Sequence, residues 1–77
     1  MYDLTMVNMY TLGDNGKSGI PEEYLNDIRG LSKMDLFKSL QVAVQEGLIN
    51  DISSQDGREW MLTQNGIMYT KALIEQI

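Results

Sequence analysis

The chain of 77 residues contains neither cysteine nor histidine, and these absences remove several kinds of site. Without cysteine there is no disulfide, no thiolate nucleophile and no thiolate metal ligand. Without histidine there is no imidazole to serve as general base, zinc ligand or switch near neutral pH. A chain of this length has one small core, so its stability must come from tight helix packing or from self-association.

Long apolar runs and a basic leader are also missing. No run approaches the roughly 20 apolar residues of a membrane-spanning helix. The first residues, Met1-Tyr2-Asp3-Leu4, do not resemble a signal peptide. We therefore expect residues 1–77 to form a single cytoplasmic domain that makes no contact with a membrane.

Positive charge is scarce, with 6 basic and 11 acidic residues and a net charge of −5. Affinity for nucleic acid rests largely on Lys and Arg side chains that neutralise phosphates. This balance weighs against nucleic-acid binding, although an acidic domain can bind DNA when its few cations gather on one face. The cations are scattered along the sequence: Lys17, Arg29, Lys33, Lys38, Arg58 and Lys71.

The first half of the chain has the spacing of two helices separated by a glycine-rich loop. The first helix is expected over residues 2–12, with Leu4, Val7 and Thr11 on one face. Pro21 suits the first position of a second helix over residues 21–28, because its missing N–H is no loss there. The apolar residues expected to face inward from this second helix are Tyr24, Leu25 and Ile28.

A third helix is expected over residues 32–46. Gly30 suits the left-handed conformation that ends the preceding helix, Ser32 suits the N-cap, and Gly47 terminates the helix. One arc of this helix is apolar and is expected to face the core: Leu36, Phe37, Leu40, Ala43 and Val44.

A β-hairpin and a final helix complete the pattern. The candidate strands are residues 49–53 and 58–62, joined at Ser54-Gln55-Asp56-Gly57, and Asp-Gly is a hairpin-turn signal. Ile52 is expected to pair with Trp60, and Trp60 is expected to anchor the hairpin in the core. Thr63 then caps a helix that runs to about residue 76.

This order resembles the winged helix-turn-helix superfamily over nearly the whole chain. The segments that carry the resemblance are Ile20-Pro21-Glu22-Glu23-Tyr24-Leu25, Leu31 to Leu40 with Gln45 to Ile49, and Trp60 to Gly66. The resemblance implies an α+β, mostly helical fold of three helices, a β-hairpin (the wing) and a fourth helix. It also implies a DNA-binding transcriptional regulator, often dimeric, although other members bind proteins or RNA.

The resemblance places the outer side of the helix over residues 32–46 in a DNA major groove. Glutamine pairs well with adenine, so Gln41 and Gln45 are candidates for reading base edges. The alternative is an ordinary solvated helix face and a short solvated hairpin. The nucleic-acid-binding residues expected on the DNA interpretation are Lys33, Lys38, Gln41, Gln45 and Arg58.

Both terminal helices are apolar over more than half of their circumference, which favours a homodimer. The alternative is that the two helices cover each other within a monomer. The residues expected at the oligomer interface are Leu4, Val7, Tyr10, Leu73, Ile74 and Ile77.

Nothing in the sequence indicates catalysis, a cofactor or a metal site. The carboxylates at a helix start and in the hairpin are explained by the helix dipole and by solubility. The rival to a DNA-binding regulator is an acidic winged-helix module or inhibitor that binds a protein and not DNA. A third interpretation is an accessory domain of a larger protein.

Overall fold

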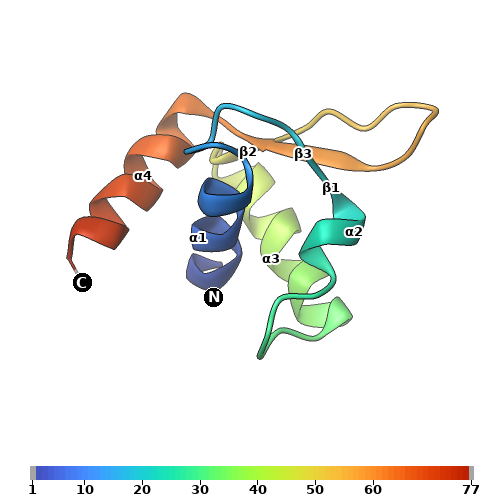
Figure 1. Cartoon of the computed structure of the whole chain (residues 1–77), viewed down its shortest axis with the longest axis horizontal. Helices are drawn as coiled ribbons and strands as arrows, with labels where there is room; N and C mark the ends of the chain where they lie inside the picture. Colours follow the sequence, from blue (N-terminus) through green and yellow to red (C-terminus); the bar gives the residue numbers. More distant parts are fainter. Residues whose placement is uncertain (1, 77) are drawn as a thin grey trace.

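The helices and strands follow one another in the order of a winged helix, and the structure, a computed structural model, describes residues 2–76 (Figure 1). The predicted α+β, mostly helical class is confirmed. The described elements are α1 (Asp3–Leu12), β1 (Ile20–Pro21), α2 (Glu22–Leu25), α3 (Lys33–Gln45), β2 (Ile49–Asp51), β3 (Glu59–Leu62) and α4 (Gln64–Glu75).

The predicted helix boundaries are set by caps and glycines. The Ser32 hydroxyl accepts a hydrogen bond from the Asp35 backbone N–H at 3.1 Å, which caps α3. Thr63 caps α4 in the same way through the Gly66 N–H at 3.0 Å. Gly47 follows the C-cap of α3 with φ of 75°, the left-handed conformation that glycine tolerates best. Gly30 is also left-handed, with φ of 79°, but it lies in the turn before α3. The prediction that Gly30 ends a second helix over residues 21–28 was wrong, since α2 already ends at Leu25.

The sheet has a third strand that the sequence did not predict. Its order is β1-β3-β2, all antiparallel, and Pro21 lies opposite Glu59 at the edge of the sheet. Pro21 was wrongly expected at the first helical position. Its φ of −59° suits a helix, but its ψ of 141° is extended. A sheet edge tolerates a residue without an N–H. Helix α2 therefore begins only at Glu22 and is four residues long.

The predicted register of the hairpin was wrong by one residue. Asp51, and not Ile52, lies opposite Trp60, while the Ile52 N–H donates to the Glu59 carbonyl. Strand β2 ends early because the Asp51 carboxylate accepts the Ser53 N–H at 2.9 Å and turns the chain. A slip of one residue reverses the face of each side chain, so Ile52 is 40% exposed while Trp60 is buried as predicted.

The core is built around the buried side of α3. Several residues that were expected to face inward are exposed in the structure. Leu36, Leu40 and Ala43 are buried, but Phe37 is 48% exposed and Val44 is 38% exposed. Ser39 is also buried and is bonded to α1, which turns the centre of the inner face away from Phe37 and Val44. In α2, Tyr24 is exposed rather than inward-facing, whereas Leu25 and Ile28 are buried as expected.

Helix α1 also presents a different face to the core from the one expected. Its buried residues are Thr5, Met6 and Met9, while Leu4 and Thr11 are exposed and Val7 is half-buried. Helices α1 and α4 lie side by side (Figure 1). The Tyr69 hydroxyl of α4 donates a hydrogen bond to the Asp3 carboxylate of α1.

Candidate nucleic-acid interface

The outer face of α3 has no covering element among residues 2–76. Four of the predicted DNA-binding residues, Lys33, Lys38, Gln41 and Gln45, are exposed on this helix. A rotation of about 100° per residue brings Lys38, Gln41 and Gln45 into one narrow stripe opposite the core. Lys33 lies about 80° outside this stripe around the helix axis and is exposed at the helix N-terminus.

Two apolar side chains share this outer face. Met34 is 68% exposed and lies in the stripe with Gln41, and Phe37 is 48% exposed beside it. Phe37 was expected in the core. Phe37 is about 60° from both Met34 and Leu40 around the helix axis, so the helical repeat alone does not decide which side it faces.

The local charge of α3 differs from that of the chain as a whole. Its sequence, KMDLFKSLQVAVQ, holds two lysines and one aspartate, a net charge of +1 in a chain of net charge −5. Asp35 lies in the first turn, where a carboxylate is stabilised by the positive end of the helix dipole. Helix α3 is therefore mildly cationic over residues 33–45, and the exposed acidic residue Glu46 follows at its C-cap.

The wing, residues 49–62, projects from the helices and is held by short-range hydrogen bonds (Figure 1). Ser54 and Gly57 exchange backbone hydrogen bonds of 3.0 and 3.1 Å around the predicted turn. The Ser53 hydroxyl accepts the Glu59 N–H at 3.1 Å. These bonds define the shape of the wing and leave its tip exposed to solvent.

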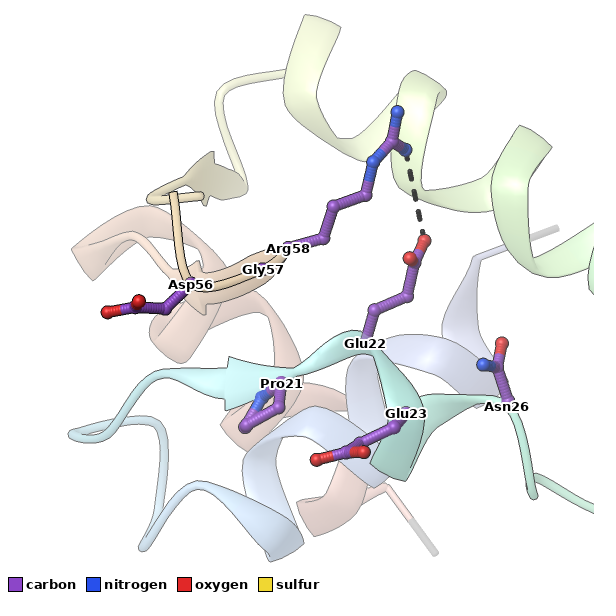
Figure 2. Close-up of a pocket in the computed structure, with 7 residues that line it drawn as sticks. All are labelled: Pro21, Glu22, Glu23, Asn26, Asp56, Gly57 and Arg58. Atoms are coloured by element: carbon purple, nitrogen blue, oxygen red, sulfur yellow. Dashed lines mark ion pairs between the residues drawn. The ribbon is translucent and has the colours of Figure 1, made fainter. Parts of the chain in front are cut away.

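Arg58, the one cation of the wing, is paired with an acid on α2. Its Nη1 lies 3.9 Å from Oε1 of Glu22, and the two side chains point toward each other across a surface groove (Figure 2). The Glu22 N–H also donates to the Arg58 carbonyl at 3.0 Å. The Arg58 side chain is 57% exposed, so solvent screens this pair and its net contribution is small. A phosphate could replace Glu22 as the partner of the guanidinium.

Acidic groups near the wing oppose an approaching phosphate. Hydrogen bonds from the Ser53 hydroxyl and N–H lower the pKa of Asp51, and the charge of Arg58 adds to this effect. Asp51 is therefore ionised at neutral pH. Asp56 lies at the tip beside Gly57 (Figure 2).

The predicted interface is thus only partly assembled. Lys38, Gln41 and Gln45 share one stripe of α3, and Lys33 lies at the N-terminus of the same helix. Arg58 lies on the wing and is paired with Glu22, which was not predicted from the sequence. Among residues 2–76, no group of three or more acidic side chains is arranged to hold a metal ion. Within the same range, no helix has the length and apolarity to cross a bilayer.

The helices, the three-stranded sheet and the projecting hairpin define a small winged-helix domain. Among solved structures, the crystal structure of SSV1 F-93 is similar to this chain, with a TM-score of 0.63 and 22% sequence identity. The match covers 99% of this chain and 89% of that chain. No protein-family model and no curated protein matches the sequence. At this level of identity the similarity supports the fold alone.

Proposed function

We propose that the protein is a non-enzymatic DNA-binding regulator that places α3 in the major groove and the wing against the phosphate backbone. The observation that carries this proposal is the uncovered outer face of α3. It bears two lysines and two glutamines and has the opposite sign of charge from the whole chain. A helix is the element that fits the major groove of B-DNA, and the adjacent wing supplies Arg58.

A binding measurement with random duplex DNA tests this proposal. At about 50 mM salt, where phosphate contacts are strongest, the protein is expected to retard the duplex in a gel. Lys38→Glu and Arg58→Glu are each expected to weaken binding. Lys17→Glu is the matched control, because it makes the same change in charge in the loop between α1 and β1. Absence of binding by the unaltered protein, or equal affinities for all four proteins, would contradict the proposal.

The regulator is proposed to act as a homodimer through α1 and α4. Leu4 is 43% exposed, and Val7, Tyr10, Leu73 and Ile74 remain half-buried. Ile77, also assigned to this interface, lies outside the described residues. The two helices cover each other in part and leave apolar surface that a second copy would bury. Sedimentation of the full chain is expected to give twice the monomer mass. Ile74→Glu is expected to lower the measured mass toward that of the monomer. A monomeric unaltered chain at high concentration would contradict the dimer.

The rival function, a protein-binding module, is supported by a different observation. Met34 and Phe37 expose apolar surface on the same face of α3, and the net charge of −5 disfavours DNA. The low-salt binding measurement separates the two functions, because a module that only binds protein would leave the duplex unretarded.

A further inference from the structure

The outer face of α3 combines amide and apolar side chains in a way that matches one kind of base pair. We propose that α3 recognises A·T base pairs, with Gln41 and Gln45 bonding adenine and with Met34 and Phe37 contacting thymine methyl groups. This inference rests on the proposed DNA-binding function and names the class of duplex that the site takes.

The amide chemistry favours adenine over guanine. In the major groove, adenine offers an acceptor at N7 and a donor at N6, and the glutamine amide provides the matching donor and acceptor. Guanine offers two acceptors, N7 and O6, which suit Arg or Lys. Gln41 and Gln45 are exposed and one helical turn apart, so they reach successive positions along a groove. We assign Lys33 and Lys38 to phosphates on either side.

The apolar side chains suit thymine, the partner of adenine in the same base pair. The C5-methyl group of thymine is the apolar feature of the unmodified major groove, and Phe is among the residues that contact it. Met34 and Phe37, which are 68% and 48% exposed, lie about two turns and one turn before Gln41 on the same face. Contact with methyl groups would remove this apolar surface from water. An A·T pair therefore offers adenine to the glutamines and a thymine methyl group to Met34 and Phe37.

Charge identifies a nucleic acid rather than an apolar protein groove as the occupant. The apolar residues are interleaved with Lys33 and Lys38, and α3 carries a net charge of +1. A groove on a protein that buried Met34 and Phe37 would also have to accommodate both ammonium groups. A duplex offers the lysines phosphates and offers the apolar side chains methyl groups.

The test compares three duplexes of equal length by fluorescence anisotropy at about 50 mM salt. The first is A·T-rich, the second has deoxyuridine in place of every thymidine and so lacks the methyl groups, and the third is G·C-rich. The full chain is expected to bind the A·T-rich duplex tightest, with roughly tenfold weaker binding to each of the others.

Single substitutions test which side chains recognise adenine and which contact the thymine methyl group. Phe37→Ala is expected to discriminate less between the thymidine and deoxyuridine duplexes, because only Met34 then contacts the methyl groups, while keeping its preference over G·C. Gln41→Ala is expected to lose much of the preference over G·C while remaining sensitive to the thymine methyl. Met68→Ala, which removes a side chain that is 63% exposed on α4, is the matched control and should behave as the unaltered protein. Circular dichroism confirms that each variant is folded.

The outcomes separate this inference from the function on which it rests. Binding of equal strength to all three duplexes would overturn A·T recognition and leave DNA binding standing. Sensitivity to the methyl group that is undiminished in Phe37→Ala would overturn the assignment of Phe37. Failure to bind any duplex would overturn the proposed function and the inference with it.

Discussion

The Thr5 hydroxyl of α1 lies 2.8 Å from the Ser39 hydroxyl of α3, and both side chains are fully buried. Ser39 donates its proton to the Leu36 carbonyl at 2.8 Å, so Thr5 is the donor between the two hydroxyls. This chain of two hydrogen bonds joins α1 to the inner side of the helix whose outer side is proposed to meet DNA. It therefore couples the packing of α1 to the orientation of α3.

Ser39→Ala is expected to destabilise the fold by about 1–3 kcal/mol, because it leaves the buried Thr5 hydroxyl without its acceptor. The loss would appear in urea unfolding followed by the fluorescence of Trp60, the one tryptophan of the chain. Adding Thr5→Val to Ser39→Ala should recover part of the loss, because both partners are then apolar. Strictly additive effects of the two single changes would contradict a direct hydrogen bond.

Gly66→Ala is expected to destabilise the fold by about 2 kcal/mol or more, because the added methyl would overlap the Leu48 carbonyl oxygen. That oxygen also accepts the Thr63 N–H at 2.9 Å, so the start of α4 cannot move away without losing this bond. Asn65→Ala, at the neighbouring exposed position, is the control and should be neutral or slightly stabilising. Equal thermal midpoints for the two variants would contradict the close approach of α4 to Leu48.

Stability is expected to fall at alkaline pH through Tyr69. The hydrogen bond to Asp3 is the main cause that raises the pKa of Tyr69 to about 12, and burial and the charge of Asp3 add to it. A pKa that is higher in the folded state than its usual value of about 10 stabilises the fold fully below pH 10. This contribution is lost as the pH rises from about 10 to 12.

The alkaline loss is measured by unfolding at a series of pH values between 8 and 12. Tyr69→Phe should remove the part of the loss that arises at this residue. Tyr24→Phe, at a tyrosine that is 60% exposed, should keep it. Identical pH dependence in the two variants would contradict a special role for the contact between α4 and α1.

Glu22→Gln is expected to strengthen DNA binding by roughly threefold, because it removes the carboxylate that competes with phosphate for Arg58. Glu23→Gln makes the same change in charge one residue away, on a side chain that points away from Arg58 (Figure 2). Its effect on the dissociation constant, measured by anisotropy at low salt, should be smaller. An equal gain in both variants would assign the effect to net charge and not to release of Arg58.

The features that could be predicted from the sequence are those determined by residues close together along the chain. Ser32 and Thr63 predicted two helix starts because a cap acts on N–H groups two or three residues away. Gly47 predicted the end of α3 because the left-handed conformation selects for glycine, whereas Gly30 wrongly predicted the end of α2, which stops at Leu25. Spacing at the helical repeat then placed Leu36 and Leu40 in the core, and four of the five predicted DNA-binding residues on an exposed helix face.

The errors arise where distant segments decide the outcome. Strand β1 exists because Ile20 pairs with Trp60, which is forty residues away along the chain. The hairpin register depends on a side-chain bond from Asp51 that no alternation pattern reveals. Phe37 was assigned to the core because Ser39, a polar residue, was not recognised as a buried position. Ser39 is buried because its hydroxyl bonds to that of Thr5 on α1.

The most direct test of DNA recognition by α3 is a titration of the ¹⁵N-labelled protein with duplex DNA, followed by NMR amide shifts. We expect the largest changes on the outer positions of α3, from Lys33 to Gln45, and on the wing around Arg58. Amides of α1 and α4 should change little. Changes concentrated on α1 and α4, or none at low salt, would show that α3 is not the surface that meets DNA.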